Sequence, residues 1–288
     1  MGKSERTILW GIDPRRDGAA ARAAVAGFLK AWTRGQALRV EPVYVAGPDE
    51  DLAEPTLDLP PRQDGVAATR VVRAEHASLS GRVDALLGEA ERAQAAVIVV
   101  STHAKGRLER LVLGSFAEEA LLRATRPIVI VNPNVTGPFR LERVLVATDL
   151  KDASKRAFDA ALDEAARRGL PTTIVRVARF DRDRPDAAFG SPEGYDQALA
   201  DYIAGERARL ESWAAAARRR GPQVEATVIE DGDDPARAIV ELAQKRRCGL
   251  IAMAPHADRL DAAVGGSVTR QVIRGAACPV WVVHAEAP

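Results

Sequence analysis

The feature that most constrains this 288-residue sequence is an internal repeat. The first copy, residues 97–131, reads VIVVSTHAKGRLERLVLGSFAEEALLRATRPIVIV, and the second, residues 250–283, reads LIAMAPHADRLDAAVGGSVTRQVIRGAACPVWVV. Each copy holds an apolar strand, a histidine, a loop, Gly-Ser, a helix-like stretch, a proline and a second apolar strand, with 13 positions from the glycine to the proline. The repeat predicts a duplicated α/β domain.

Charge and composition exclude several classes of protein. The sequence has 41 Lys and Arg against 40 Asp and Glu, a net charge of +1, so no global field favours nucleic acid or an anionic membrane. The longest apolar runs, such as residues 95–100, are too short to span a bilayer, and the opening MGKSERT holds no apolar signal stretch. Cys248 and Cys278 form no CxxC motif and are interpreted as core residues. We expect a cytoplasmic protein without nucleic-acid or membrane partners.

Strand-like and helix-like segments alternate along both halves of the chain. The first half predicts strands at 7–13, 38–45, 66–73, 97–101 and 128–131, and helices at 19–32, 80–92 (with Ser80 as its cap) and 114–123. The second half predicts strands at 144–149, 172–177, 224–230, 250–253 and 280–283. It predicts helices at 154–168 and 195–220 and a third that opens at Asp234-Pro235 and runs to Lys245, with the proline at a tolerated early position. We therefore predict two tandem Rossmann-like domains, residues 1–134 and 140–288, joined by a linker at 135–139. Each would hold a five-stranded parallel sheet flanked by helices.

Ligands of such sheets bind beyond the carboxyl ends of the strands, where the strand order reverses. Asp13, Asp149 and the loops holding His103 and His256 lie at such ends. Each aspartate could cap the next helix or hydrogen-bond a nucleotide base or ribose. The two histidines have no neighbours that would suggest a metal site or a catalytic triad, so we interpret them as loop-packing or ligand-edge residues, and we predict no catalytic residue and no metal site.

The Gly-Ser of each copy has two interpretations. Ser115 and Glu118 fit a capping box, in which their side chains bond the free backbone amides at a helix start. Those amides could instead hold a phosphate. The loop between His103 and Gly114 carries Lys105, Arg107, Glu109 and Arg110, which sum to +2. The corresponding loop of the second copy carries Asp258, Arg259 and Asp261, which sum to −1. A triphosphate should therefore prefer the first loop.

These residues resemble the universal stress protein family in its tandem two-domain form, over nearly the whole chain. RVLVATDLKDASKRA, residues 143–157, is similar to the family's opening strand and helix, and EDGDDPARAIVELA, residues 230–243, to its third-strand-to-helix segment. The resemblance implies an adenine nucleotide alpha hydrolase-like fold. It also implies pairing of residues 128–131 with 280–283 across a pseudo-two-fold axis, an internal pseudo-dimer that leaves a homodimer of whole chains open.

Nucleotide-binding members of that family carry Gly-x2-Gly-x9-Gly-[Ser/Thr] after the fourth strand, and this sequence departs from the motif in both copies. The first copy keeps the spacing but has Ser101 and Ala104 at the leading glycines, while the second has Ala254 and Ala257 there and is one residue shorter. The resemblance implies a weakened first site and a degenerate second one. The first site comprises Asp13, the backbone near Val43, Ser101, His103, Ala104, Gly114 and Ser115, and the second comprises Asp149, Ala254, Ala257, Gly266 and Ser267.

Three hypotheses about function follow. The first is a stress-response protein that binds ATP or another adenine nucleotide in its first domain, with Mg²⁺ as a further candidate. The second is a nucleotide-independent scaffold or regulator that acts through unknown protein partners, motivated by the missing glycines. The third, an ATP-using enzyme, is disfavoured because the sequence lacks an SGGxDS-type loop, a GxxxxGK[ST] motif and an HExxH motif. At most, slow ATP hydrolysis would accompany the first.

Overall fold

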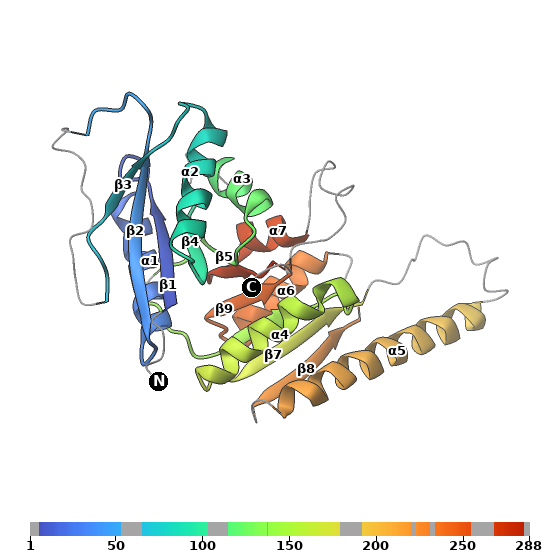
Figure 1. Cartoon of the computed structure of the whole chain (residues 1–288). Coiled ribbons are helices and arrows are strands. Elements are labelled where there is room, and N and C mark those ends of the chain that lie inside the picture. The colour runs from blue at the N-terminus through green and yellow to red at the C-terminus, as the bar shows by residue number, and fades with distance from the viewer. Residues whose placement is uncertain are drawn as a thin grey trace.

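The computed structural model describes residues 6–52, 65–102, 115–136, 138–178, 192–219, 223–230, 234–254 and 268–284. Strands and helices alternate along these ranges, as the sequence predicts (Figure 1). The strands are β1 (Arg6–Ile12), β2 (Leu38–Ala46), β3 (Arg70–Arg73), β4 (Val97–Ser101), β5 (Ile128–Val131), β6 (Val144–Ala147), β7 (Thr172–Val177), β8 (Val224–Ile229), β9 (Leu250–Met253) and β10 (Val280–Val282). The helices are α1 (Ala19–Thr33), α2 (Leu79–Arg92), α3 (Ser115–Arg123), α4 (Asp152–Arg167), α5 (Pro192–Arg218), α6 (Pro235–Lys245) and α7 (Val268–Gly275).

The strands of the described chain form one sheet in the order β3-β2-β1-β4-β5-β10-β9-β6-β7-β8. Each half of the sheet is parallel and has the same order, with the first strand of the half beside both its second and its fourth. The strand order therefore reverses between β1 and β4 in the first half, and between β6 and β9 in the second. Figure 1 shows β3 and β8 at opposite ends of the sheet.

The two halves join through their last strands, which confirms the predicted internal pairing. β5 and β10 are antiparallel, with Val129 opposite Trp281 at the centre of the register. Around this seam the ring of Trp281 lies edge-on to Trp32 of α1, with centroids 5.4 Å apart. Nδ2 of Asn132 donates to the carbonyl of Ala276 at 2.8 Å. The pairing covers two apolar strand edges that would otherwise be open to another chain.

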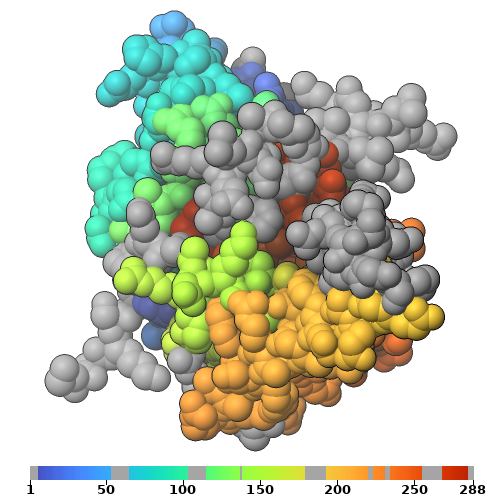
Figure 2. Space-filling model, turned by 90° about the vertical axis from the view of Figure 1, so that its right-hand side faces the viewer, coloured from blue at the N-terminus to red at the C-terminus, as the bar shows by residue number. Residues whose placement is uncertain are grey.

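Helices cover both faces of the sheet, because the strands are apolar on both sides. One buried cluster joins the sheet to α2, α3, α6 and α7, and the other joins it to α1, α4 and α5. Figure 2 shows α4 and α5 side by side on the surface of the molecule, over the face of the sheet that they cover. Between these helices the rings of Phe158 and Trp213 lie 4.8 Å apart. Cys248 and Cys278 belong to the first cluster and are free and buried, as predicted. Burial raises the pKa of Cys248 to about 11 and that of Cys278 to about 12.

Helix starts and strand bounds largely follow the sequence, with two corrections. α6 begins at Pro235, as predicted, and the structure shows that Asp234 caps it by accepting a hydrogen bond from the amide of Arg237 at 3.0 Å. The predicted cap Ser80 is wrong, because α2 begins one residue earlier and Ser78 accepts the amide of Gly81 instead. The predicted strand at 66–73 is also too long: β3 covers only its last four residues, and Val66 forms a single isolated bridge.

The chain between the halves packs against the first domain. Val135 is buried, and the ring of Phe139 lies edge-on to Phe28 of α1 at 5.5 Å. Across the described ranges, no helix combines the length and the apolar character needed to cross a membrane.

Candidate functional site

A cavity of about 510 Å³ opens at the carboxyl ends of β1, β2 and β4 in the first domain. It lies where the strand order reverses, the place at which parallel α/β sheets bind ligands. Its lining residues come from these strands, from the loops that follow them and from the starts of α2 and α3: Gly11, Ile12, Asp13, Arg16, Asp17, Val43, Tyr44, Val45, Ala77, Leu79, Arg82, Leu86, Val100, Ser101, Thr102, Ser115, Phe116 and Ala117. The volume is in the usual range for a small-molecule site.

The floor of the cavity exists because β1 carries a glycine. A Cβ added at Gly11 would lie 3.1 Å from Cγ1 of Val100 and 3.3 Å from Cδ1 of Leu86. Val43 pairs with Gly11 of β1 on one side and with Arg70 of β3 on the other, so its backbone lies inside the sheet. The residue also lines the cavity. The floor is therefore an apolar surface of the kind that receives a flat ring.

Two aspartates organise the loop after β1. The buried carboxylate of Asp17 accepts the amide of Asp13 at 2.7 Å and the hydroxyl of Ser101. The carboxylate of Asp13 accepts the amide of Arg15 at 3.1 Å, and its second oxygen lies 3.6 Å from Nε of Arg16. Asp13 therefore closes a short turn rather than capping α1, and it keeps part of its carboxylate exposed at the cavity.

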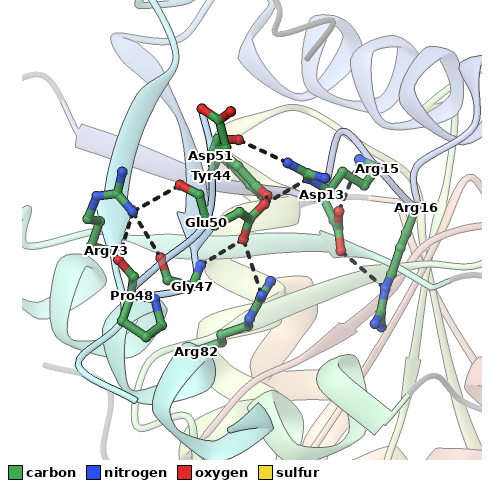
Figure 3. Close-up of polar contacts among 10 residues, drawn as sticks. All are labelled: Asp13, Arg15, Arg16, Tyr44, Gly47, Pro48, Glu50, Asp51, Arg73 and Arg82. Carbon is green, nitrogen blue, oxygen red and sulfur yellow. Dashed lines mark hydrogen bonds and ion pairs between the residues drawn. The ribbon is translucent and has the colours of Figure 1, made fainter. Parts of the chain in front are cut away.

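Glu50 organises the opposite rim. Its carboxylate accepts the amide of Gly47 at 2.7 Å and the hydroxyl of Tyr44, and it lies 2.8 Å from Nε of Arg15 and 3.2 Å from Nη2 of Arg82 (Figure 3). We call these five residues the Glu50 cluster. Burial by itself would raise the pKa of Glu50, but the Gly47 amide, the Tyr44 hydroxyl and the two guanidinium groups lower it below its ordinary value. Burial, followed by the hydrogen bond to Glu50, raises the pKa of Tyr44 to about 12. At neutral pH the cluster therefore holds a carboxylate, a neutral phenol and two cations.

The structure brings four of the seven predicted first-site residues to this cavity. Asp13, Val43, Ser101 and Ser115 all line it. Ser101, at the position of a family glycine, donates its hydroxyl to Asp17. The other three, His103, Ala104 and Gly114, lie outside the described residues.

Glu118, which the sequence assigns to a capping box with Ser115, has a partner in the other domain. Ser115 is the first residue of α3, and the carboxylate of Glu118 forms an ion pair with Arg270 of α7 at 2.9 Å. Glu118 and Arg270 follow the serine of their Gly-Ser by three positions each, so equivalent residues of the two copies meet across the seam. This contact could not be predicted from the sequence, because it depends on how the domains pair.

The equivalent place in the second domain is built differently. The register makes Ala147 the counterpart of Gly11, since it pairs with Val175 as Gly11 pairs with Val43. Asp149 accepts the amide of Lys151 at 3.0 Å and the hydroxyl of Ser154 at 2.7 Å. Of the other predicted second-site residues, Ala254 is half-buried at the end of β9. The remaining three, Ala257, Gly266 and Ser267, lie outside the described residues.

The sequence-based prediction missed three residues that line the first cavity, Gly11, Asp17 and Arg82, and also Glu50, which pairs with Arg82 beside it. A glycine inside the apolar strand TILWGID was a usable signal, because a strand interior gains nothing from glycine unless space is needed. The others gave no such signal. Glu50 is one of many acidic residues in a loop, and only the fold brings it to Arg82, which is 32 positions away.

The fold and the cavity define a tandem α/β protein with its binding cleft at the switch point of the first domain. The universal stress protein family model matches residues 5–132 and 140–284, so this chain belongs to the universal stress protein family.

Relatives and solved structures agree with that assignment. A universal stress protein of Mycobacterium tuberculosis is 29% identical over 287 residues, covering 97% of this chain and 96% of the relative. One of Mycobacterium bovis is 26% identical over 197 residues, or 66% of this chain, and the match spans only 62% of that relative. A crystal structure of a universal stress protein from Archaeoglobus fulgidus has a TM-score of 0.64 at 16% identity, covering 98% of this chain and 100% of the other. At that identity it supports the fold alone.

Proposed function

We propose that the first domain binds an adenine nucleotide or nucleoside in the cavity at the ends of β1, β2 and β4. The observation that carries the proposal is that four residues predicted from the sequence, Asp13, Val43, Ser101 and Ser115, line a single cavity of about 510 Å³ at the switch point.

The lining suits the parts of such a ligand. The apolar floor beside Gly11 and Val43 takes the base, and the exposed part of the Asp13 carboxylate accepts hydrogen bonds from an exocyclic amino group or from ribose hydroxyls. Ser115 at the start of α3 faces the region where helix amides favour a phosphate. ATP, with Mg²⁺ on its phosphates, belongs to the class of ligands that we propose.

Calorimetric titration of the full chain tests this proposal with a matched pair of variants. Adenosine and AMP should bind to about one site per chain, and guanosine should bind more weakly because its O6 is an acceptor facing a carboxylate. Asp13→Ala should weaken adenosine by about tenfold, the effect of one hydrogen bond to a charged group, while Asp149→Ala should not change it. Absence of binding by every adenine compound, or equal losses in both variants, would refute the proposal.

A scaffold that acts through protein contacts remains the second candidate, and one observation in the second domain favours it. Where the first domain has Tyr44 at the end of β2, the second has Arg176 on β7, and its guanidinium pairs with the buried Glu206 of α5. The long helix α5 therefore contacts the end of β7. The equivalent strand end in the first domain, that of β2, lines the cavity. Unchanged partner capture by an Asp13→Ala chain, together with no adenine binding by the wild type, would support this alternative.

A further inference from the structure

Two guanidinium groups line the first cavity and could meet a phosphate, those of Arg16 and Arg82. Both already face a carboxylate. Nη2 of Arg82 lies 3.2 Å from Glu50, and Nε of Arg16 lies 3.6 Å from Asp13. A ligand phosphate would have to share these cations with the protein's own anions.

Of the two pairs, Glu50 with Arg82 is the more firmly built. Glu50 is 12% exposed and is held by the amide of Gly47 and the hydroxyl of Tyr44 as well as by Arg15. A Cβ at Gly47 would lie 3.1 Å from Nη2 of Arg82, so the missing side chain gives the guanidinium room to reach Glu50. Figure 3 shows the Glu50 carboxylate enclosed by these donors at the end of β2.

The charges of the described lining cancel. Asp13 and Asp17 contribute two negative charges, and Arg16 and Arg82 contribute two positive ones. Glu50 stands directly behind Arg82, while Arg15, its second cation, reaches past the rim to the carbonyl of Asp51 at 3.1 Å. The described walls therefore offer no excess positive charge to a polyphosphate, although they offer acceptors and an apolar floor.

We propose that Glu50 is a specificity-determining residue: by holding the guanidinium of Arg82, it lowers the affinity of the cavity for ATP relative to adenosine. The inference rests on the proposed function, because it concerns which adenine ligand the same cavity takes. Glu50 contacts Arg82 rather than the ligand, so its effect is on charge and not on shape. Removing its charge frees Arg82 for the phosphates and leaves the floor and Asp13 in place.

A merely structural role for Glu50 makes a different prediction. If Glu50 only fastened residues 47–52 to α2 and to the loop after β1, its loss would weaken all adenine ligands by the same factor. The ratio of the ATP and adenosine dissociation constants therefore separates the two roles, and it is insensitive to a uniform loss of folded protein.

The test is calorimetric titration of adenosine, AMP and ATP into the full-length wild type, Glu50→Gln and Glu50→Gln/Arg82→Gln. Glutamine keeps the shape of Glu50 and one acceptor oxygen for the Gly47 amide, and its NH2 group can donate to the Tyr44 hydroxyl oxygen. Glu50→Gln should gain about tenfold in ATP affinity relative to adenosine, the effect of one charge-assisted hydrogen bond, and the double variant should lose that gain.

Glu142→Gln is the matched control, because it makes the same change of net charge at an exposed ion pair with Arg140. It should leave the ratio unchanged. Adenosine binding with the same ratio in the wild type and Glu50→Gln would overturn this inference and leave the proposed function standing. Failure of every adenine compound to bind either protein would overturn both.

Discussion

The two domains have the same strand order and register but differ at the carboxyl ends of their strands. In the first domain a glycine, Gly11, opens the floor and Ser101 joins a buried network, whereas the second domain has Ala147 and Ala254 at the equivalent places. Both sets of strands are equally buried between helices. The apolar strand interiors therefore specify the shared fold, while a few residues at the carboxyl ends of the strands shape the cavity of the first domain.

The same contrast holds for the polar groups. At the end of β2 the first domain has the Glu50 cluster, which joins the strand to α2 and to the loop after β1. At the end of β7 the second domain has Arg176, which pairs with Glu206 of α5. One arrangement frames a cavity and the other fixes a long helix.

The largest effect is expected when Gly11 is replaced by alanine, the residue that the second domain has at the equivalent position 147. Gly11→Ala places a Cβ against Val100 and Leu86, and because Gly11 lies in an extended strand, space is the only obstacle. We expect adenosine affinity to fall by about a hundredfold, ~2.7 kcal/mol, as measured by calorimetric titration.

Gly88→Ala is the control for that change, since nothing lies within 4 Å of a Cβ at Gly88 in α2. It should leave binding unchanged and should stabilise the helix by about 0.5–1 kcal/mol. Equal affinities of Gly11→Ala and Gly88→Ala would show that the floor beside Gly11 is not where the ligand sits.

A smaller effect is expected at the network beside Asp13. Asp17→Ala leaves the hydroxyl of Ser101 and the amide of Asp13 without their acceptor, which should lower the free energy of unfolding by about 2 kcal/mol. Ser101→Ala should cost less. In urea unfolding, the double variant should lose clearly less free energy of unfolding than the sum of the two single losses, because both substitutions remove the same hydrogen bond between Ser101 and Asp17. Strict additivity would contradict the network.

The Glu50 cluster gives a prediction about pH. Because the pKa of Tyr44 is raised to about 12 in the folded protein, its contribution to stability is complete below the ordinary value of 10.0 and is lost as the pH rises through about 12. The difference in phenolate absorbance between wild type and Tyr44→Phe should therefore show a step near pH 12. A step near pH 10 would mean that Tyr44 is not buried against Glu50.

The smallest effect is expected at the seam, where the equivalent positions Glu118 and Arg270 carry opposite charges. Glu118→Arg would set two cations together and should cost about 1 kcal/mol in urea unfolding. Exchanging the pair, Glu118→Arg with Arg270→Glu, should recover most of that loss. No recovery in the exchanged protein would show that the two side chains do not interact.

Apolar periodicity and the repeat predicted the tandem α/β fold with its parallel sheets, and the family resemblance implied the pairing of β5 with β10. The sequence also placed Asp13, Val43, Ser101 and Ser115 at one site. It missed what depends on long-range contact: the Asp17 network, the Glu50 cluster and the ion pair of Glu118 with Arg270. It mistook Ser80 for the cap of α2, because Ser78 and Ser80 are separated by a single residue and only the backbone conformation shows at which of them the helix begins.

The central claim, that the first domain alone holds the adenine site, is tested most directly by photolabelling with 8-azidoadenosine and peptide mapping. We expect label that adenosine prevents, confined to peptides of the first domain that line the cavity, such as those with Tyr44, Leu86 or Val100. Adenosine-protected label on β6, β7 or β9 of the second domain, or no protected label at all, would contradict it.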